Sequence, residues 1–170
     1  MVMEPTGRHI SFEELTIEDQ KLLKAARKTM ERAYNPYSGF FVGAAALTQK
    51  GERVTGTNVE TAAYGDSICA ERVALLKANS LGYGNQCIAV AVITKNKDNP
   101  TTEISAPCGS CRQMIYEFAQ RSGVDKDFKI IMSTTNFDKI VVATIGDLLP
   151  MAFGPKDLGI GAENPAKIPV

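Results

Sequence analysis

The chain has 170 residues and no net charge, with 44% hydrophobic and 22% charged residues. These values are typical of a globular domain with a sizeable core, and they argue against a large basic surface for nucleic acid. No apolar run approaches the ~20 residues that a membrane helix needs, and no apolar segment follows basic residues at the N-terminus. We therefore expect a cytoplasmic protein without a membrane span or secretory signal.

The first part of the chain predicts an arm followed by a helix. Residues 1–14 show no clear hydrophobic period, and we interpret them as an N-terminal arm. Thr16, with Asp19 three residues later, resembles a helix start. The apolar residues that follow recur at helical spacing before Asn35-Pro36 and are Leu22, Leu23, Ala26, Met30 and Ala33.

Two strands joined by a turn are expected after this helix. Residues 41–48 are apolar, residues 49–52 contain turn formers, and residues 53–59 are the expected partner strand. The small residues from Gly43 to Ala46 indicate that a helix packs closely against the first of these strands.

A second helix and a buried strand come next. Asp66 and Ser67 are candidate caps for a helix over residues 69–79. Residues 87–94 are rich in Val, Ile and Ala, which predicts a strand covered on both faces. The expected buried face of the helix contains Ala70, Val73, Ala74 and Leu76.

The remaining elements complete a layered fold. Pro107 suits the first turn of a third helix that ends near residue 122. Residues 128–134 and 140–145 predict a second pair of strands, a helical turn follows, and residues 155–170 form a Gly- and Pro-rich tail. The order αββαβαββ predicts one α/β domain over residues 1–170, with three α/β/α layers and a five-stranded mixed sheet.

The cysteines point to a metal site. In a chain with a core and no export signal, clustered thiols more often bind metal or act in catalysis than form disulfides. Cys108 and Cys111 share one helix face and could hold two corners of a tetrahedral zinc, although redox pairs and buried cysteines use this spacing too. Cys69 supplies a third ligand. We interpret Cys87 as a small core residue and His9 as a polar residue of the arm.

Three protein ligands with an open fourth position are the pattern of a catalytic zinc site. Glu71 is the expected proton carrier, although a carboxylate at a helix N-terminus is also favoured by the helix dipole alone. Residues two apart on a helix point about 200° apart, so Cys69 and Glu71 can share a site only if the helix begins about there. Three thiolates over-neutralise Zn²⁺, so we expect Arg72 to donate to them; a surface charge is the alternative.

A zinc ligand, one residue, Glu, and later Pro-Cys-x-x-Cys form the signature of zinc nucleobase deaminases. Cys69-Ala70-Glu71 and Pro107-Cys108-Gly109-Ser110-Cys111 match it. The chain resembles, in particular, the free-nucleoside cytidine deaminase family of the all-cysteine zinc type. The resembling segments run in the family's order, from about residue 15 to 158, and include 35–45, 58–60, 69–72, 108–113 and 148–153.

The resemblance implies one zinc per subunit and the hydrolysis of cytidine and 2′-deoxycytidine to uridine and 2′-deoxyuridine plus ammonia, as in pyrimidine salvage. Glu71 would move a proton from the attacking water to the ring, and Arg72 and Gln113 would donate hydrogen bonds around the zinc ligands. It also implies a homotetramer whose neighbouring subunits help to close each pocket through Tyr64 and Phe153. The residues implied in substrate binding are Phe40, Asn58, Glu60, Tyr64, Ala70 and Phe153.

The sequence departs from the family pattern at Thr61, where Asn is common, at Ala106, where Ser is frequent, and in a longer loop over residues 95–106. Three alternatives remain open. A related enzyme could act on another aminopyrimidine nucleoside, such as a nucleoside antibiotic. A polynucleotide deaminase is disfavoured because Glu60 would repel a phosphate. A non-enzymatic zinc module or nucleoside-binding protein is disfavoured by Glu71 and the open zinc position.

Overall fold

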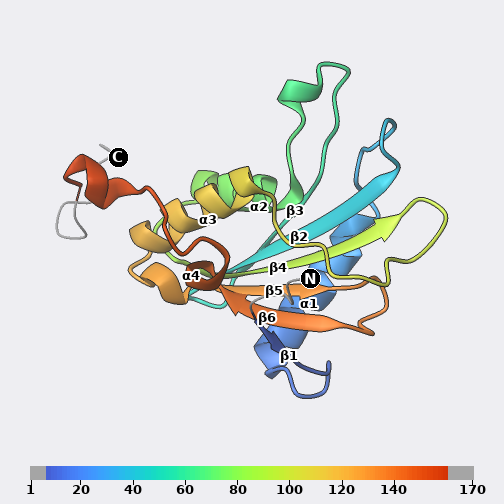
Figure 1. Ribbon diagram of the computed structural model, residues 1–170, viewed down its shortest axis with the longest axis horizontal. Coiled ribbons are helices and arrows are strands. Elements are labelled where there is room, and N and C mark those ends of the chain that lie inside the picture. Colours follow the sequence, from blue (N-terminus) through green and yellow to red (C-terminus); the bar gives the residue numbers. More distant parts are fainter. Residues whose placement is uncertain (1–6, 161–170) are drawn as a thin grey trace.

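The computed structural model describes residues 7–160, and a six-stranded sheet lies at the centre of this range (Figure 1). Its order is β1-β6-β5-β4-β2-β3; β4 and β5 are parallel and the other neighbouring strands are antiparallel. The strands are β1 (Arg8–His9), β2 (Phe40–Thr48), β3 (Arg53–Thr57), β4 (Cys87–Asn96), β5 (Lys129–Ser133) and β6 (Ile140–Thr144).

The expected five strands are present, but the prediction of a five-stranded sheet is wrong by one strand. β1 comes from the segment interpreted as an arm, and it pairs with the edge strand β6, Arg8 opposite Val142 and His9 opposite Val141. Both β1 residues are exposed, so they carry no hydrophobic alternation from which a strand could be predicted. Residues 1–6 of the arm and 161–170 of the tail lie outside the described residues.

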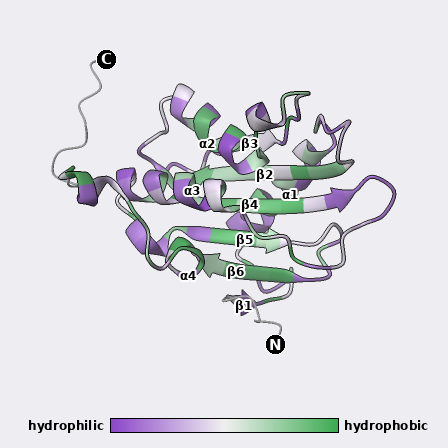
Figure 2. Cartoon of the chain, turned by 45° about the horizontal axis from the view of Figure 1, so that its top comes forward, coloured by the Kyte–Doolittle hydropathy of each residue, from purple (hydrophilic) through white to green (hydrophobic). Residues whose placement is uncertain are grey.

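Helices cover both faces of the sheet, which confirms the three-layer prediction (Figure 1). α1 packs on one face, and α2 and α3 pack on the other. Figure 2 shows apolar residues along most of β4, β5 and β6 and a mixture of polar and apolar residues on α3. No helix in the described range is long and apolar enough to cross a membrane. The helices are α1 (Ile17–Met30), α2 (Ala70–Ser80), α3 (Gly109–Arg121) and the single turn α4 (Ile145–Leu148).

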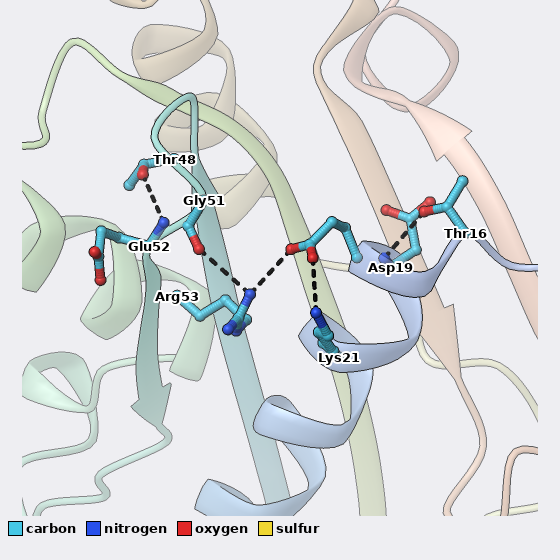
Figure 3. A network of polar contacts seen from close by, with 8 residues as sticks. Thr16, Asp19, Lys21, Thr48, Gly51, Glu52 and Arg53 are labelled. Atoms are coloured by element: carbon cyan, nitrogen blue, oxygen red, sulfur yellow. Dashed lines mark hydrogen bonds and ion pairs between the residues drawn. The ribbon is translucent and has the colours of Figure 1, made fainter.

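α1 begins where the sequence predicted, because the Thr16 hydroxyl accepts a hydrogen bond from the Asp19 N–H at 3.1 Å (Figure 3). In the same first turn, Glu18 accepts hydrogen bonds from Lys21 at 3.1 Å and from Arg53 at 3.0 Å, which links α1 to the start of β3. These ion pairs are substantially exposed and each contributes at most about 1 kcal/mol. The position of α1 is therefore set by its buried residues: Leu22, Leu23, Ala26 and Met30.

Two helices begin at the same edge of the sheet. β3 and β4 both run antiparallel to β2, so the carboxyl ends of these two strands lie at the same end of the sheet, where both helices begin. α2 follows β3 and α3 follows β4, and the residues just before these helices are Cys69 and Cys108. The strand order therefore brings two cysteines together that are 39 residues apart in the sequence.

α2 begins later than its expected caps. Its N-cap residue is Cys69, whereas Asp66 ends a short 3₁₀ turn and the Ser67 hydroxyl accepts a hydrogen bond from the Thr61 N–H at 3.1 Å. The expected buried face is also partly wrong, because Leu76 is 46% exposed. The sheet side of α2 is instead a row of small residues with one leucine: Ala70, Ala74, Leu75 and Ala78.

The sheet side of α2 carries small residues because α2 approaches β3 closely. A Cβ atom added to Gly56 would lie 2.4 Å from the backbone nitrogen of Ala74 and 2.5 Å from the carbonyl oxygen of Ala70. On the other face, a Cβ at Gly43 would lie 2.1 Å from the Ala26 carbonyl oxygen of α1. The close packing predicted from the small residues of β2 is thus confirmed, and the α2 residues that meet Gly56 are the alanines Ala70 and Ala74.

We expect Gly56→Ala to lower the free energy of unfolding by about 3 kcal/mol, because the added methyl group meets helix backbone that cannot rotate aside. Urea denaturation measures this change. Gly65→Ala is the matched control, since a Cβ there has no neighbour within 4 Å and the variant should unfold like the unmodified protein. Equal stability of both variants would show that α2 can shift away from β3 at little cost.

Candidate functional site

Three cysteine sulfurs lie within 4.8 Å of one another where α2 and α3 begin. The Cys69 and Cys108 sulfurs are 3.8 Å apart, and those of Cys108 and Cys111 are 3.5 Å apart. A tetrahedral zinc with Zn–S bonds of about 2.3 Å separates its sulfur ligands by about 3.8 Å. A disulfide needs about 2.05 Å, and all four cysteines are free. The cluster therefore fits three corners of a zinc site, as expected.

The chemistry of the thiols also fits a metal. Hydrogen bonds from Cys111, together with those from Cys108 and Arg72, lower the pKa of the Cys69 thiol to about 5. The hydrogen bond between Cys111 and Cys69 raises the pKa of the Cys111 thiol, and burial and the nearby Glu71 act in the same direction. Three thiolates can exist together here only with a strong positive charge among them, and a divalent cation supplies it.

The fourth cysteine stays outside this cluster. Cys87 is fully buried in β4, and its thiol donates to the Tyr83 carbonyl oxygen at 3.4 Å. Burial raises the pKa of this thiol to about 11. The interpretation of Cys87 as a small core residue is confirmed. His9 lies exposed on β1, at the sheet edge opposite β3.

Glu71 lies in the first turn of α2, two residues after the N-cap Cys69. This confirms the geometric condition that the helix begins where both side chains can share a site. Glu71 is only 4% exposed, and this burial raises the pKa of its carboxyl above the ordinary value; the nearby Cys69 acts in the same direction. A buried carboxyl group next to a metal-binding cluster is placed to exchange protons with a bound molecule.

Arg72 lies against the cluster. Its Nη2 is 4.0 Å from the Cys69 sulfur and donates to the Ser67 carbonyl oxygen at 3.2 Å. Its Nε is buried and has no hydrogen-bond partner among the described residues. The guanidinium therefore lies beside the Cys69 sulfur, and its role toward the thiols stays a prediction.

A cavity of about 320 Å³ opens next to the sulfurs, a size at the lower end of the range for small-molecule sites. Its lining includes Cys69, Glu71 and Cys108 together with Phe40, Asn58 and Glu60. The structure thus brings together the metal cluster, the expected proton carrier and three of the expected substrate-binding residues.

Asn58 and Glu60 are both held by the backbone of β2 and the preceding loop. The Asn58 side chain accepts from the Val42 N–H at 2.9 Å and donates to the Phe40 carbonyl oxygen at 2.8 Å. The Glu60 carboxylate accepts from the N–H groups of Tyr37 and Ser38, at 3.0 and 3.1 Å, and from the Ser38 hydroxyl. The hydrogen bond from that hydroxyl is the main cause that lowers the pKa of Glu60.

The other predicted site residues do not line this cavity. Tyr64 is 72% exposed and Phe153 is 61% exposed. The Gln113 amide donates to the Phe153 carbonyl oxygen at 2.8 Å, so its partner in the structure is the C-terminal segment. Ala70 is fully buried between α2 and β3.

Sequence reasoning missed several residues of the cavity wall. Ser38 stands inside a segment that resembles the family, but a serine in a loop carries no signal of its own. The apolar positions Val42 and Val92 look like any core residue of a strand. Thr94 is a polar residue of β4 itself, whereas Ser105 reaches the wall because the loop after β4 folds back on that strand.

Comparison with known proteins gives a consistent result. Residues 16–124 match the family described as the cytidine and deoxycytidylate deaminase zinc-binding region. A cytidine deaminase of Halalkalibacterium halodurans is 39% identical over 142 residues, covering 84% of this chain and 98% of the relative. A probable cytidine deaminase of Dictyostelium discoideum is 38% identical over 147 residues, covering 86% and 91%. The crystal structure of the cytidine deaminase from Burkholderia pseudomallei has a TM-score of 0.70 and 38% identity, covering 82% of this chain and 100% of that one.

Proposed function

The chain belongs to the family of cytidine and deoxycytidylate deaminases, and on this basis we propose that it deaminates cytidine and 2′-deoxycytidine to uridine and 2′-deoxyuridine, as in pyrimidine salvage. The observation that carries the proposal is the buried Glu71 beside three clustered cysteine sulfurs, at a cavity that also contains Asn58 and Glu60. These groups supply a metal site, a proton carrier and a polar end for a sugar.

Cys69, Cys108 and Cys111 would hold one zinc ion per chain, which when bound lowers the pKa of a water molecule at its open position. Glu71 would accept a proton from this water and deliver it to the pyrimidine ring nitrogen. Its burial keeps bulk water away, so that the proton passes to the bound molecule. Since the thiols must stay reduced to bind the metal, we also place the protein in the cytoplasm.

The presence of Glu60 in the cavity wall favours a nucleoside over a nucleic acid. The Glu60 carboxylate can accept a hydrogen bond from a sugar hydroxyl, whereas a phosphate at the same position would be repelled by its charge. Asn58 also lines the cavity, and Phe40 offers an aromatic ring for the base. These residues would hold the nucleoside with its base toward Glu71 and its sugar toward Glu60.

A substrate panel tests the proposed activity. The zinc-loaded protein is incubated separately with cytidine, 2′-deoxycytidine, cytosine and a cytosine-containing oligonucleotide, and the loss of cytosine absorbance and the release of ammonia are followed. We expect turnover of the two nucleosides and no turnover of the oligonucleotide. Turnover of the oligonucleotide alone would contradict the proposal. Turnover of only another aminopyrimidine nucleoside would redirect it to a different substrate of the same class.

Arg72 should affect the rate through the charge of the site. Three thiolates leave a zinc site with a net negative charge, and the guanidinium at 4.0 Å from the Cys69 sulfur offsets part of it. We expect Arg72→Gln to lower kcat about tenfold, or ~1.4 kcal/mol in the activation free energy, with zinc still bound. Arg72→Lys keeps the positive charge, so its kcat should fall less than that of Arg72→Gln. Equal turnover in all three proteins would show that the charge of Arg72 does not act on the site.

We also propose that four chains assemble, with Tyr64 and Phe153 of neighbouring subunits closing each cavity. The exposure of both side chains supports this, as does the exposed Tyr37, whose ring meets that of Tyr64 edge-on at 5.4 Å. Sedimentation analysis should give the mass of four chains. Tyr64→Ser should raise KM if the side chain covers a neighbour's substrate, and a fully active single chain would contradict the proposal.

A further inference from the structure

The Ser38 hydroxyl connects two groups that face the same cavity. It donates to Oε1 of Glu60, and it accepts from the Phe40 N–H at 3.0 Å. All three residues line the cavity. One hydroxyl thus joins the Glu60 carboxylate to the backbone of Phe40.

The loop before β2 presents its donors to Glu60 in a fixed arrangement. The Gly39 N–H donates back to the Asn35 carbonyl oxygen at 3.0 Å, and Gly39 has a φ of +64°, which favours glycine in this tight turn. Two consecutive N–H groups of the loop, from Tyr37 and Ser38, donate to the other carboxylate oxygen, Oε2. These backbone donors are present whatever side chain stands at position 38, so only the hydroxyl depends on serine.

The Ser38 hydroxyl matters because few acceptor positions of the Glu60 carboxylate remain available. A carboxylate has about four lone-pair positions, and three donors of the loop occupy three of them. The remaining position lies on Oε1, the oxygen that the Ser38 hydroxyl holds. The orientation of this last acceptor is therefore set by the side chain of Ser38.

We propose that Ser38 is a positioning residue, which orients Glu60 to accept a hydrogen bond from a sugar hydroxyl of the nucleoside. The inference rests on the proposed function, and it adds the residue that makes the carboxylate selective for the sugar. Ser38 acts through Glu60, and the proposal requires no direct contact between its hydroxyl and the nucleoside.

A mutant cycle on the zinc-loaded protein tests this, with KM and kcat measured for cytidine. Ser38→Ala should raise KM about tenfold, as for one loosened hydrogen bond to a charged group, with kcat within about twofold. Ser38→Thr, which keeps the hydroxyl, should restore KM. The double variant Ser38→Ala with Glu60→Gln should be no worse than Glu60→Gln alone, because the effect passes through Glu60. The proposal would be overturned if the increases in KM of the two single variants multiplied in the double variant. It would also be overturned if KM were unchanged in Ser38→Ala.

Two further arms separate this inference from the proposed activity. The Ser38→Ala effect should disappear with either 2′-deoxycytidine or 3′-deoxycytidine, whichever lacks the hydroxyl that Glu60 accepts; an equal effect on both would overturn the inference. Calorimetry of cytidine binding in the Glu71→Gln background repeats the comparison without turnover. If the unmodified protein deaminates nothing but Ser38→Ala still weakens binding about tenfold, the activity is wrong and the role of Ser38 stands. If Ser38→Ala leaves binding unchanged, the role of Ser38 is refuted.

Discussion

Glu71→Gln is expected to lower kcat for cytidine by at least about a thousandfold while one zinc ion stays bound per chain. Glutamine has nearly the same shape and size as glutamate and can still form hydrogen bonds. Its amide, however, cannot accept a proton from water and pass it on. General acid–base catalysis contributes about 10²- to 10⁴-fold, and Glu71 is expected to act in more than one proton transfer. Because the carboxyl is only 4% exposed, bulk water has little access to replace it.

The measurement combines steady-state kinetics with metal analysis of the same preparation. Glu18→Gln is the matched control, since Glu18 is also a glutamate in the first turn of a helix but lies half-exposed on α1, paired with Lys21 and Arg53. It should keep full activity, which separates proton transfer from a favourable charge at a helix N-terminus. Loss of zinc from Glu71→Gln would show that Glu71 is a metal ligand. Retained activity would show that Glu71 takes no part in the reaction.

Cys111→Ser is expected to abolish activity by a different route, the loss of the metal. A serine hydroxyl is not deprotonated at neutral pH and is a poor zinc ligand, so the site is left with two sulfurs. Metal analysis after dialysis should find well below one zinc per chain. Because zinc binds the folded chain, its loss should also lower the melting temperature, and the unmodified protein treated with a chelator should show the same decrease.

Cys87→Ser is the control for this variant, because Cys87 is buried in β4 without contact to the other sulfurs. It places a hydroxyl in the core and is expected to lose some stability, yet it should keep one zinc per chain and its kcat. A Cys111→Ser protein that still holds one zinc per chain would contradict the ligand assignment. A Cys108–Cys111 disulfide found in the active, unmodified protein would support a redox role instead.

The sequence predicted the chemical parts of the site because they are encoded locally. Cys108 and Cys111 share a helix face through a spacing of three, and Glu71 follows Cys69 at a helix start. Each of these patterns lies within one helical turn of backbone, and the structure places all four residues together. The element order αββαβαββ was also recoverable, since hydrophobic period and turn residues are local properties.

Features that depend on distant contacts were predicted less well. β1 consists of two exposed residues that become a strand only because β6 offers an unpaired edge. Leu76 is apolar but points away from the sheet, because the face of α2 that meets Gly56 is the one with Ala70 and Ala74. Asp66 and Ser67 have the chemistry of helix caps, yet the bridge between Val59 and Ile68 keeps the chain extended until Cys69.

The sequence alone determined which chemical groups are available for the proposed reaction: three thiols that fit zinc, one glutamate and one arginine. Only the tertiary structure decided how these groups are used. It placed Cys69 and Cys108 within 3.8 Å across 39 residues, and it put Ser38, Phe40 and Glu60 around one cavity. The physical reason is that residue types and short spacings fix the available charges and ligands, whereas their distances depend on the order in which the strands pair.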